Sequence, residues 1–225
     1  MRPHVTINMA MSVDGKISTR LREDFSFGSK EDRRLMDVLR ARADAVVVGS
    51  RTVASGGWAI RVRDRDIRRK RVASGHTLHP LNVVLTRALD LPSTKQFFTH
   101  SQTRRLVITT RAASDVRVRR FKKCAEVVVL PAKRIRASRA LTLLAERGIR
   151  RVLVEGGGAL NYAFFEEGLV DEIYVTITPR IIAGADAPTV VDGKGFLAAN
   201  LFPLELVSSR RKDNEVFLRY RAVRR

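Results

Sequence analysis

Three consecutive glycines stand at a point in the chain where phosphate binding is possible. The apolar run Arg151–Val154 leads to Glu155 and the glycines, and a helical pattern begins directly after them. Glycines let the phosphates of a ligand approach the backbone, and a helix N-terminus offers unpaired N–H groups and a positive dipole end. We therefore predict that a pyrophosphate is cradled by Gly156, Gly157, Gly158, Ala159, Leu160 and Asn161.

This glycine run differs from the usual dinucleotide fingerprint. It lacks the G-x-G-x-x-G spacing, and no acidic residue about 20 positions further on marks an ordinary Rossmann site. A tight strand-to-helix turn without a ligand is the alternative explanation, but three adjacent glycines cost backbone entropy and favour a binding role. Glu155 lies at the carboxyl end of the strand, where ligands bind in open α/β sheets. Its carboxylate can accept hydrogen bonds from ribose hydroxyls, or it caps the turn.

Two further apolar runs end in hydroxyl and arginine side chains. Residues 45–48 are followed by Arg51 and Thr52, and residues 81–85 by Thr86 and Arg87. A threonine hydroxyl can donate to a phosphate, and a guanidinium suits the extra phosphate that distinguishes NADPH from NADH. Each arginine alone is weak support in a chain with 43 Lys and Arg residues.

The N-terminal segment supplies a third motif. A strand is predicted over residues 5–10, and the chain then turns at Asp14 and Gly15. An Asp-Gly pair alone indicates only a turn. Met9 and Met11 in this segment are more often core residues than cofactor contacts.

Short apolar runs rich in Val and Ile supply the elements that position these motifs. Continuous apolar strands are typical of a mostly parallel sheet with helices on both faces. We predict strands at 5–10, 45–48, 81–85, 106–109, 126–130, 151–154 and 172–178, and helices at about 30–43, 138–147 and 159–167. The last two strands, 204–208 and 215–220, flank a turn and form an antiparallel hairpin. The prediction is one α/β domain over residues 1–225, with residues 56–80 as a long charged loop.

The charge balance is strongly basic. The chain has 225 residues with 43 Lys and Arg against 23 Asp and Glu, a formal charge of +20. Nucleic acid is therefore a candidate partner. The arginines are dispersed, however, and only 6% of residues are aromatic, so no basic segment is interleaved with aromatics for base stacking. Nucleic-acid binding stays a minor alternative, beside a general arginine bias of the source proteome.

Cysteine, histidine and hydropathy narrow the class further. Cys124 is the single cysteine, so no intrachain disulfide is possible, and we expect it to be a small buried hydrophobe. One cysteine and four scattered histidines predict no metal site, and His76 and His79 are expected as solvated loop residues. No apolar run approaches about 18 residues, and the N-terminus lacks a signal-peptide layout. A cytoplasmic location without a membrane partner is the default expectation.

Taken in order, these segments resemble the reductases of riboflavin biosynthesis. The resemblance is carried by Asn8–Lys16, by Leu39–Ala41 with Ala45–Val53, by Glu155–Gly158, by Glu167–Glu172, and by Ala187–Thr189 with Gly193–Phe196. It covers nearly the whole chain. The length is similar to that of the stand-alone archaeal-type reductase, without the deaminase domain of the fused bacterial enzyme. The resemblance implies a dihydrofolate-reductase-like three-layer fold and a homodimer.

The resemblance also implies a reaction and a set of roles. NADPH would reduce a ribosylamino-pyrimidine 5′-phosphate to its ribitylamino form, with hydride going to C1′ of the ring-opened sugar. Because the cofactor carries this chemistry, the protein would supply orientation and electrostatics. The implied cofactor contacts are Met11, Thr52, Thr86 and Gly156 to Asn161. The implied substrate contacts are Arg40 and Arg63 on the 5′-phosphate, Glu155 on the sugar and, by a loose alignment, Asp24.

Some roles stay open at this point. Arg40 without a substrate role would be an ordinary solvated helix residue, and Arg63 a solvated loop residue. Where the family usually carries Asp-Asp-Pro, this chain has Gly56, Gly57 and Trp58. The loss of these carboxylates leaves a dihydropterin or dihydrofolate-type reductase as the alternative, with Trp58 as a flat contact for the pterin or else a loop anchor. No general acid is evident.

Overall fold

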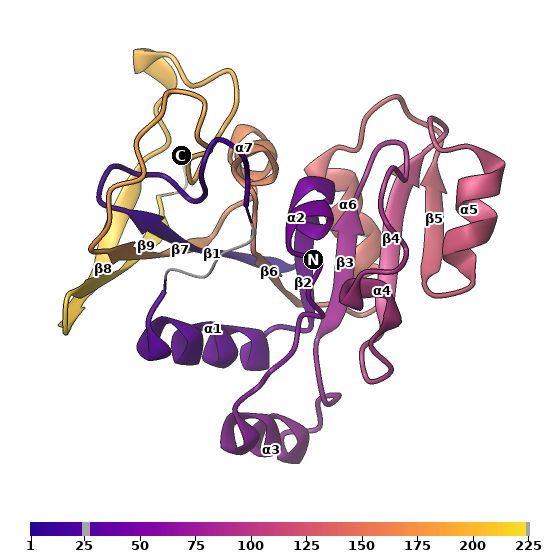
Figure 1. Ribbon diagram of the computed structural model, residues 1–225, viewed down its shortest axis with the longest axis horizontal. Coiled ribbons are helices and arrows are strands. Elements are labelled where there is room, and N and C mark those ends of the chain that lie inside the picture. The colour runs from indigo at the N-terminus through magenta and orange to yellow at the C-terminus, as the bar shows by residue number, and fades with distance from the viewer. Residues whose placement is uncertain (24–27, 224–225) are drawn as a thin grey trace.

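One large sheet organises the molecule (Figure 1). The computed structural model describes residues 1–23 and 28–223. Within these residues the sheet has nine strands in the order β5-β4-β3-β2-β6-β1-β7-β9-β8. The first seven in this order are parallel, and β9 and β8 join antiparallel at one edge. The structure confirms a mostly parallel sheet closed by an antiparallel C-terminal hairpin.

The strands follow the apolar runs of the sequence closely. Their bounds are β1 His4–Ser12, β2 Ala45–Gly49, β3 Leu81–Leu85, β4 Arg105–Thr110, β5 Glu126–Leu130, β6 Arg151–Val154, β7 Glu172–Thr178, β8 Leu204–Lys212 and β9 Glu215–Ala222. Strands β2, β3, β4 and β6 are buried along most of their length, as expected for parallel strands covered on both faces. The hairpin turns later than predicted, at Asp213 and Asn214, so β8 extends to Lys212.

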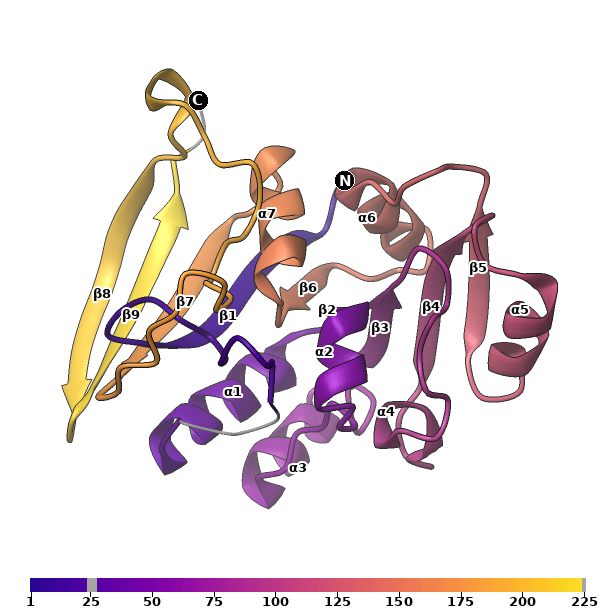
Figure 2. The same ribbon diagram turned by 45° about the horizontal axis from the view of Figure 1, so that its top comes forward.

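Helices cover both faces of the sheet and create two separate cores, which gives three layers (Figure 2). On one face lie α6 (Ala137–Ala145) and α7 (Gly158–Glu166), whose leucines and phenylalanines pack on β1, β2 and β6. On the other face lie α1 (Lys30–Arg42), α4 (Gln96–Thr99) and α5 (Asp115–Lys122). The short helix α2 (Ser50–Ser55) follows β2 directly, and Val53 joins it to this second core.

Helix α1 begins at Lys30, as the sequence predicts, with Ser29 as its N-cap. The Ser29 hydroxyl accepts hydrogen bonds from the amides of Glu31 and Asp32, at 3.0 and 3.2 Å. This satisfies two of the four unpaired amides at a helix start. The Glu215 carboxylate accepts from the Ser29 amide at 2.9 Å, so the beginning of α1 is tied to β9.

Four expectations drawn from the sequence were wrong. Residues 56–80 are not one long loop, because α3 (Arg65–Ala73) forms within them, with Asp64 as its N-cap. His79 is buried rather than solvated, since its Nδ1 accepts from the Val62 amide at 3.3 Å. His76 is half-buried and faces the Asp44 carboxylate at 3.6 Å. Cys124 is partly exposed rather than buried.

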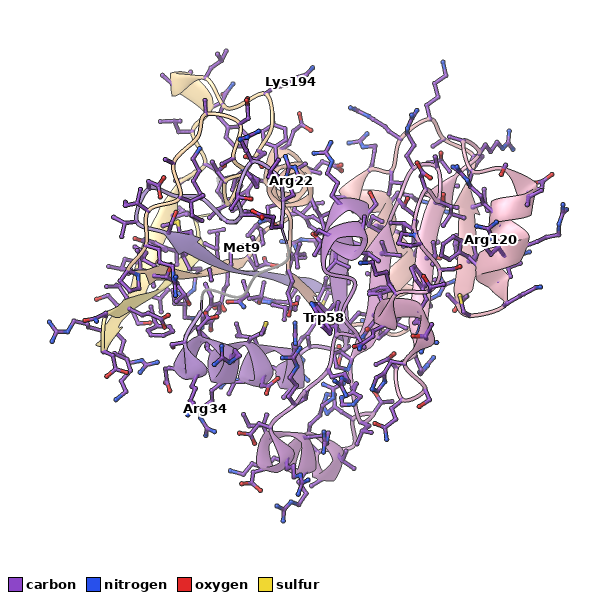
Figure 3. The ribbon with its side chains drawn as sticks, in the orientation of Figure 1. Met9, Arg22, Arg34, Trp58, Arg120 and Lys194 are labelled. Atoms are coloured by element: carbon purple, nitrogen blue, oxygen red, sulfur yellow. The ribbon has the colours of Figure 1, made fainter. Side chains whose placement is uncertain are left out.

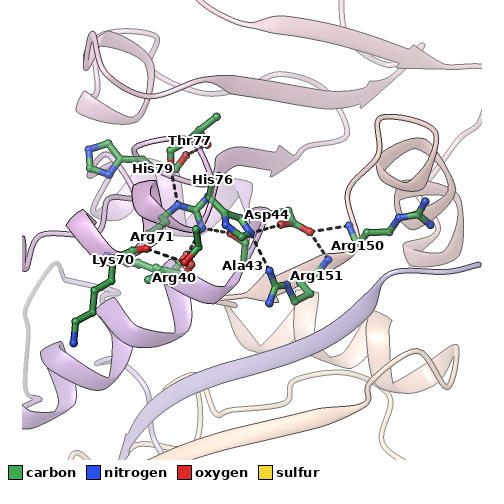
Figure 4. A network of polar contacts seen from close by, with 12 residues as sticks. Arg40, Ala43, Asp44, Lys70, Arg71, His76, Thr77, His79, Arg150 and Arg151 are labelled. Atoms are coloured by element: carbon green, nitrogen blue, oxygen red, sulfur yellow. Dashed lines mark hydrogen bonds and ion pairs between the residues drawn. The ribbon is translucent and has the colours of Figure 1, made fainter. Parts of the chain in front are cut away.

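Arg71 of α3 holds the C-terminal end of α1 (Figure 4). Its buried guanidinium donates to the carbonyls of Ala41, Ala43 and Thr77 at 2.7–2.8 Å. The Ala41 and Ala43 carbonyls lie at the end of α1, where a helix leaves carbonyls unpaired. Asp44 follows at once and accepts from two backbone amides at the start of β6. The contacts therefore fix the end of α1, where Arg40 lies, against the sheet.

Candidate active site

A cleft of about 580 Å³ opens at the carboxyl ends of β2, β3 and β6. Strand-to-helix connections build its wall, as is general for ligand sites in open α/β sheets. The wall includes Met9, Gly49, Arg51, Thr52, Thr86, Arg87, Glu155, Gly157, Gly158, Ala159 and Leu160. Met9, Arg22 and Trp58, labelled in Figure 3, reach this cleft from three separate segments of the chain.

The glycine run forms the turn between β6 and α7. Gly156 has a φ of +73°, and its peptide bond to Gly157 is cis. Gly157 is the N-cap of α7, and its amide donates to the Thr52 hydroxyl at 2.9 Å. The Gly49 amide donates to the Gly156 carbonyl at 2.8 Å. The turns after β2 and β6 are therefore joined to each other at the floor of the cleft.

The space around Gly157 and Gly158 explains why glycines stand there. A Cβ on Gly158 would lie 2.4 Å from the Thr189 carbonyl oxygen and 2.6 Å from a carboxylate oxygen of Asp192. A Cβ on Gly157 would have no neighbour closer than 3.9 Å, the distance to the Thr52 hydroxyl, which is an ordinary van der Waals contact. The first glycine of the helix is thus required by packing, whereas its neighbour leaves room for a ligand to approach the backbone.

A buried ion pair forms the second part of the wall. Arg40 donates through Nε and Nη2 to the two carboxylate oxygens of Glu155, both at 2.7 Å, and through Nη1 to the Arg61 carbonyl at 3.1 Å. The two side chains are only 8% and 11% exposed. Burial opposes the charge on Arg40, but the Glu155 carboxylate outweighs it and raises the pKa of the guanidinium. A bidentate contact of this kind fixes the orientation of both side chains.

Two further arginines, Arg61 and Arg63, lie close to this ion pair. Loss of solvent, followed by the charges of Arg40 and Arg61, lowers the pKa of the Arg63 guanidinium. Burial and the neighbouring Arg68 and Arg61 lower the pKa of His79 to about 4, so this imidazole is neutral at pH 7. Like charges held this close disfavour one another, and an anion would relieve the repulsion.

Comparisons with known proteins identify the family of this chain. Residues 3–218 match the model of the RibD C-terminal domain. This chain belongs to that family. A 2,5-diamino-6-ribosylamino-4(3H)-pyrimidinone 5′-phosphate reductase from Archaeoglobus fulgidus is 40% identical over 197 residues, which cover 88% of this chain and 90% of the relative. The family resemblance inferred from the motifs is therefore confirmed, and the relative is by name an oxidoreductase.

Solved structures similar to this RibD-family chain support the fold. A pyrimidine reductase-like protein from Corynebacterium diphtheriae has a TM-score of 0.86 at 24% identity, covering 99% of this chain and 93% of that one. A dihydrofolate reductase from Enterococcus faecalis has a TM-score of 0.54 at 11% identity, covering 97% and 96%. At such identities the likeness concerns the fold alone, and it confirms the dihydrofolate-reductase-like architecture. The dihydropterin alternative is not favoured, and no nucleic-acid or membrane partner is indicated.

The structure brings most of the predicted cofactor residues of this family member to one cleft. Arg51, Thr52, Thr86 and Arg87 line it together with residues 157–160. Gly156 and Asn161 lie behind the wall, where the Asn161 side-chain amide donates to the Val190 carbonyl at 2.7 Å. Met11 is half-buried and off the cleft. Met9 lines it instead, two residues earlier on the same strand face.

The predicted substrate residues divide into three groups. Glu155 and Arg40 line the cleft as an ion pair, so Arg40 is not the solvated helix residue of the alternative interpretation. Arg63 is exposed and lies off the cleft wall; its backbone amide donates to an Asp37 carboxylate oxygen at 3.0 Å. Asp24 lies outside the described residues.

Sequence reasoning missed several residues at the cleft. Arg22, Glu23, Arg134 and Asp192 all line it. Arg134 follows β5, so the rule that ligands meet strand ends predicts it without the structure. Asp32 was missed as well: it is buried on the first turn of α1, and burial, assisted by the charge of Glu215, raises the pKa of its carboxyl. An acidic residue in the first turn of a helix is normally explained by its favourable interaction with the helix N-terminus. Burial of the Asp32 side chain was therefore not expected from the sequence.

No helix among residues 1–23 and 28–223 has the length and apolar character needed to cross a bilayer. In the same part of the chain, no three His, Cys, Asp or Glu side chains gather closely enough to hold a metal ion.

Proposed function

We propose that this chain uses NADPH to reduce 2,5-diamino-6-ribosylamino-4(3H)-pyrimidinone 5′-phosphate to its ribitylamino form, a step of riboflavin biosynthesis. One observation carries the proposal: the glycine turn at Gly157 and the buried Arg40–Glu155 pair share the wall of one cleft. The name of the Archaeoglobus relative supports the choice of substrate. When bound, NADPH supplies the hydride that reaches C1′, so the protein binds and orients both partners.

The residues at the turn fit a dinucleotide. Because Gly157 carries no side chain and lies on the cleft wall, a diphosphate can approach the first amides of α7, which carry the positive end of the helix dipole. We propose that Gly157, Gly158, Ala159 and Leu160 hold the diphosphate, with the Thr52 hydroxyl donating to it. Arg51 and Arg87, both exposed on the wall, provide guanidinium groups for the 2′-phosphate that marks NADPH.

The substrate sugar is assigned to Glu155. Each of its carboxylate oxygens accepts one hydrogen bond from Arg40 and retains a lone pair for a ribose hydroxyl. Arg40 then acts by holding the carboxylate ionised and correctly oriented, rather than by clamping the 5′-phosphate as the family resemblance implies. Three of its five N–H groups already have partners in Glu155 and the Arg61 carbonyl.

The 5′-phosphate is assigned to the positive charge behind the pair. Arg63 carries a pKa lowered by loss of solvent and by two neighbouring guanidinium groups, so an anion there removes an existing repulsion. Arg61 lies beside it, with Nη1 3.0 Å from Nε2 of His100. We propose that Arg63 and Arg61 together bind the phosphate.

We further propose that residues 1–225 form one catalytic domain that works as a cytoplasmic homodimer. The edge strand β8 is exposed along most of its length, and Leu204 and Leu206 on it are 39% and 52% exposed. Unpaired strand edges with apolar side chains favour pairing with another chain. Light scattering of the purified protein tests this directly, and a monomeric mass would contradict it.

The experiment for the activity is a steady-state assay of NADPH oxidation by the purified chain. We expect turnover with the ribosylamino-pyrimidinone 5′-phosphate and weak or no turnover with its dephosphorylated form. Arg63→Ala should raise KM for the phosphorylated substrate by about 10–100-fold, since hydrogen bonds to charged groups are worth about 1.5–3 kcal/mol. Arg69→Ala is the matched control, because Arg69 is an exposed α3 arginine paired with Asp66.

Two outcomes would overturn the proposal in different ways. No NADPH oxidation with the phosphorylated pyrimidinone, but turnover of a dihydropterin, would exchange the substrate class. An unchanged KM in Arg63→Ala, with a normal response to the phosphorylated substrate, would remove the assignment of the phosphate to this cluster.

A further inference from the structure

The single tryptophan of the chain lies on the wall of the cleft. Trp58 is 54% exposed, although its large ring gains most from burial of all side chains. Figure 3 places it in front of the sheet, where the half containing β1 and α1 meets the half containing β3 to β5. More than half of the accessible surface of this residue is therefore exposed on the cleft wall.

The backbone before Trp58 is fixed. Gly57 has a φ of +67°, and its carbonyl accepts from the Phe97 amide at 2.7 Å. A Cβ at Gly57 would lie 2.6 Å from the Lys95 side chain, so this stretch is packed closely against α4. Phe97 itself is fully buried.

The backbone after Trp58 is fixed as well. Ala59 and Ile60 are 2% and 6% exposed. The side chain of Asn82, which is fully buried on β3, accepts from the Ile60 amide at 3.0 Å and donates to the Ile60 carbonyl at 2.9 Å. Trp58 thus stands between two anchored segments, and its exposure does not come from a loose loop.

The position of Trp58 also links it to the ion pair of the site. Three residues after it, the Arg61 carbonyl accepts from Arg40, and Arg40 holds Glu155. The anchored segment 57–61 therefore relates the tryptophan ring to the carboxylate that we assign to the substrate sugar. A flat apolar face, held rigid at a set place beside hydrogen-bonding groups, is suited to stacking on a planar ring.

We propose that Trp58 is a stacking platform for a planar nitrogen heterocycle bound in the cleft, and that it contributes to substrate specificity. The assignment rests on the proposed function. The heterocycle has two possible sources: the pyrimidinone ring of the substrate and a ring of the cofactor. Both offer the same chemistry, a π-face carrying polar edges, and the experiment separates them.

The first measurement uses wild-type protein. Because Trp58 is the only tryptophan, intrinsic indole fluorescence reports on this ring alone. Titration with NADP⁺, with the ribosylamino-pyrimidinone phosphate and with a dihydropterin should quench or shift the emission for the ligand that stacks. Ribose 5-phosphate, which has no heterocycle, should leave the emission unchanged. This titration needs no turnover, so it tests the platform even if the proposed reaction fails.

The second measurement compares variants. Trp58→Leu should lower the affinity for the stacked ligand by about tenfold or more, because base–aromatic stacking is worth about 1–3 kcal/mol. Trp58→Phe should fall between this variant and the wild type. Val116→Ala, an exposed apolar residue on α5 away from the cleft, is the control and should change neither constant. A rise in substrate KM at constant NADPH affinity assigns the pyrimidinone ring, and the reverse assigns the cofactor.

The proposal is overturned if none of these ligands alters Trp58 emission. It is equally overturned if Trp58→Leu changes both the substrate KM and the NADPH dissociation constant by less than twofold while its Tm matches the wild type. A normal Tm excludes misfolding of the variant as the reason for any loss of affinity.

Discussion

The two parts of the cleft, the glycine turn and the Arg40–Glu155 ion pair, present different chemical groups to a ligand. The part around Gly157 and Gly158 presents the backbone at the start of α7, and packing at Gly158 excludes a Cβ. The part around Glu155 presents a carboxylate held by Arg40, so its geometry depends on two side chains from separate segments. A backbone site can bind any diphosphate, whereas a side-chain site can select one substrate. Under the proposed function, we therefore assign general cofactor binding to the first part and specificity to the second.

Removing one partner of the ion pair should have the largest effect. Glu155→Ala leaves the Arg40 charge buried and unpaired, which costs about 3–5 kcal/mol of unfolding free energy. The double variant Arg40→Met with Glu155→Met removes both charges and should recover much of this loss without recovering activity. Denaturant unfolding and NADPH oxidation measure the two quantities separately. Unfolding of Glu155→Ala within about 0.5 kcal/mol of the wild type would show that the pair is not truly buried.

Substitutions at the glycines should separate packing from binding. Gly158→Ala places a methyl group against the Thr189 carbonyl and Asp192, and should lower the unfolding free energy by about 1–3 kcal/mol. Gly157→Ala places its methyl group no closer than 3.9 Å to any neighbour, so the fold should tolerate it. The methyl group occupies the approach to the helix amides, however, and should weaken NADPH binding by at least about tenfold, or 1.4 kcal/mol. Calorimetric titration showing wild-type affinity in Gly157→Ala would contradict a backbone site for the diphosphate.

The smallest expected effect concerns Asp32, which lies near the side-chain part of the site. Burial raises the pKa of its carboxyl, with Glu215 adding to the shift and a contact with Thr176 opposing it. A carboxyl whose folded pKa is raised stabilises the fold below its unfolded pKa, and this contribution is lost as pH rises through the folded pKa. At neutral pH the ionised group therefore costs stability.

Asp32→Asn should raise the Tm by a few degrees near pH 7, with the difference shrinking as the pH falls into the acid range. Thermal unfolding across a pH series measures this. Asp66→Asn, an exposed carboxylate on α3, is the control and should show little change. A Tm of Asp32→Asn below that of the wild type at neutral pH would mean that the carboxylate is stabilised by its surroundings.

The backbone part of the site could be predicted from sequence because its signal is local. Three glycines between an apolar run and a helical pattern lie within a few residues, and the strand bounds followed from continuous apolar runs buried on both faces. The same reasoning located Arg51, Thr52, Thr86 and Arg87 at the ends of β2 and β3, where the structure places them on the cleft.

For the side-chain part, the sequence predicted which residues belong to the site but not that they contact one another. Arg40 and Glu155 are 115 residues apart in sequence, and no spacing rule shows that they meet. Helix α3 was missed because its nine residues are mostly charged, so it has little apolar periodicity and depends on the Asp64 cap and on Arg71. His79 was expected in solvent because a polar loop surrounds it, yet tertiary packing buries it.

The hydrogen bond between Gly157 and Thr52 has a consequence for the kind of group that the cleft accepts. The Thr52 oxygen already receives the proton of the Gly157 amide, which leaves the hydroxyl proton free to point elsewhere. The Gly157 amide thus orients the hydroxyl so that its proton can be donated to an oxygen carrying negative charge. Serine at this position would keep that directionality, whereas valine, with nearly the same shape, would erase it.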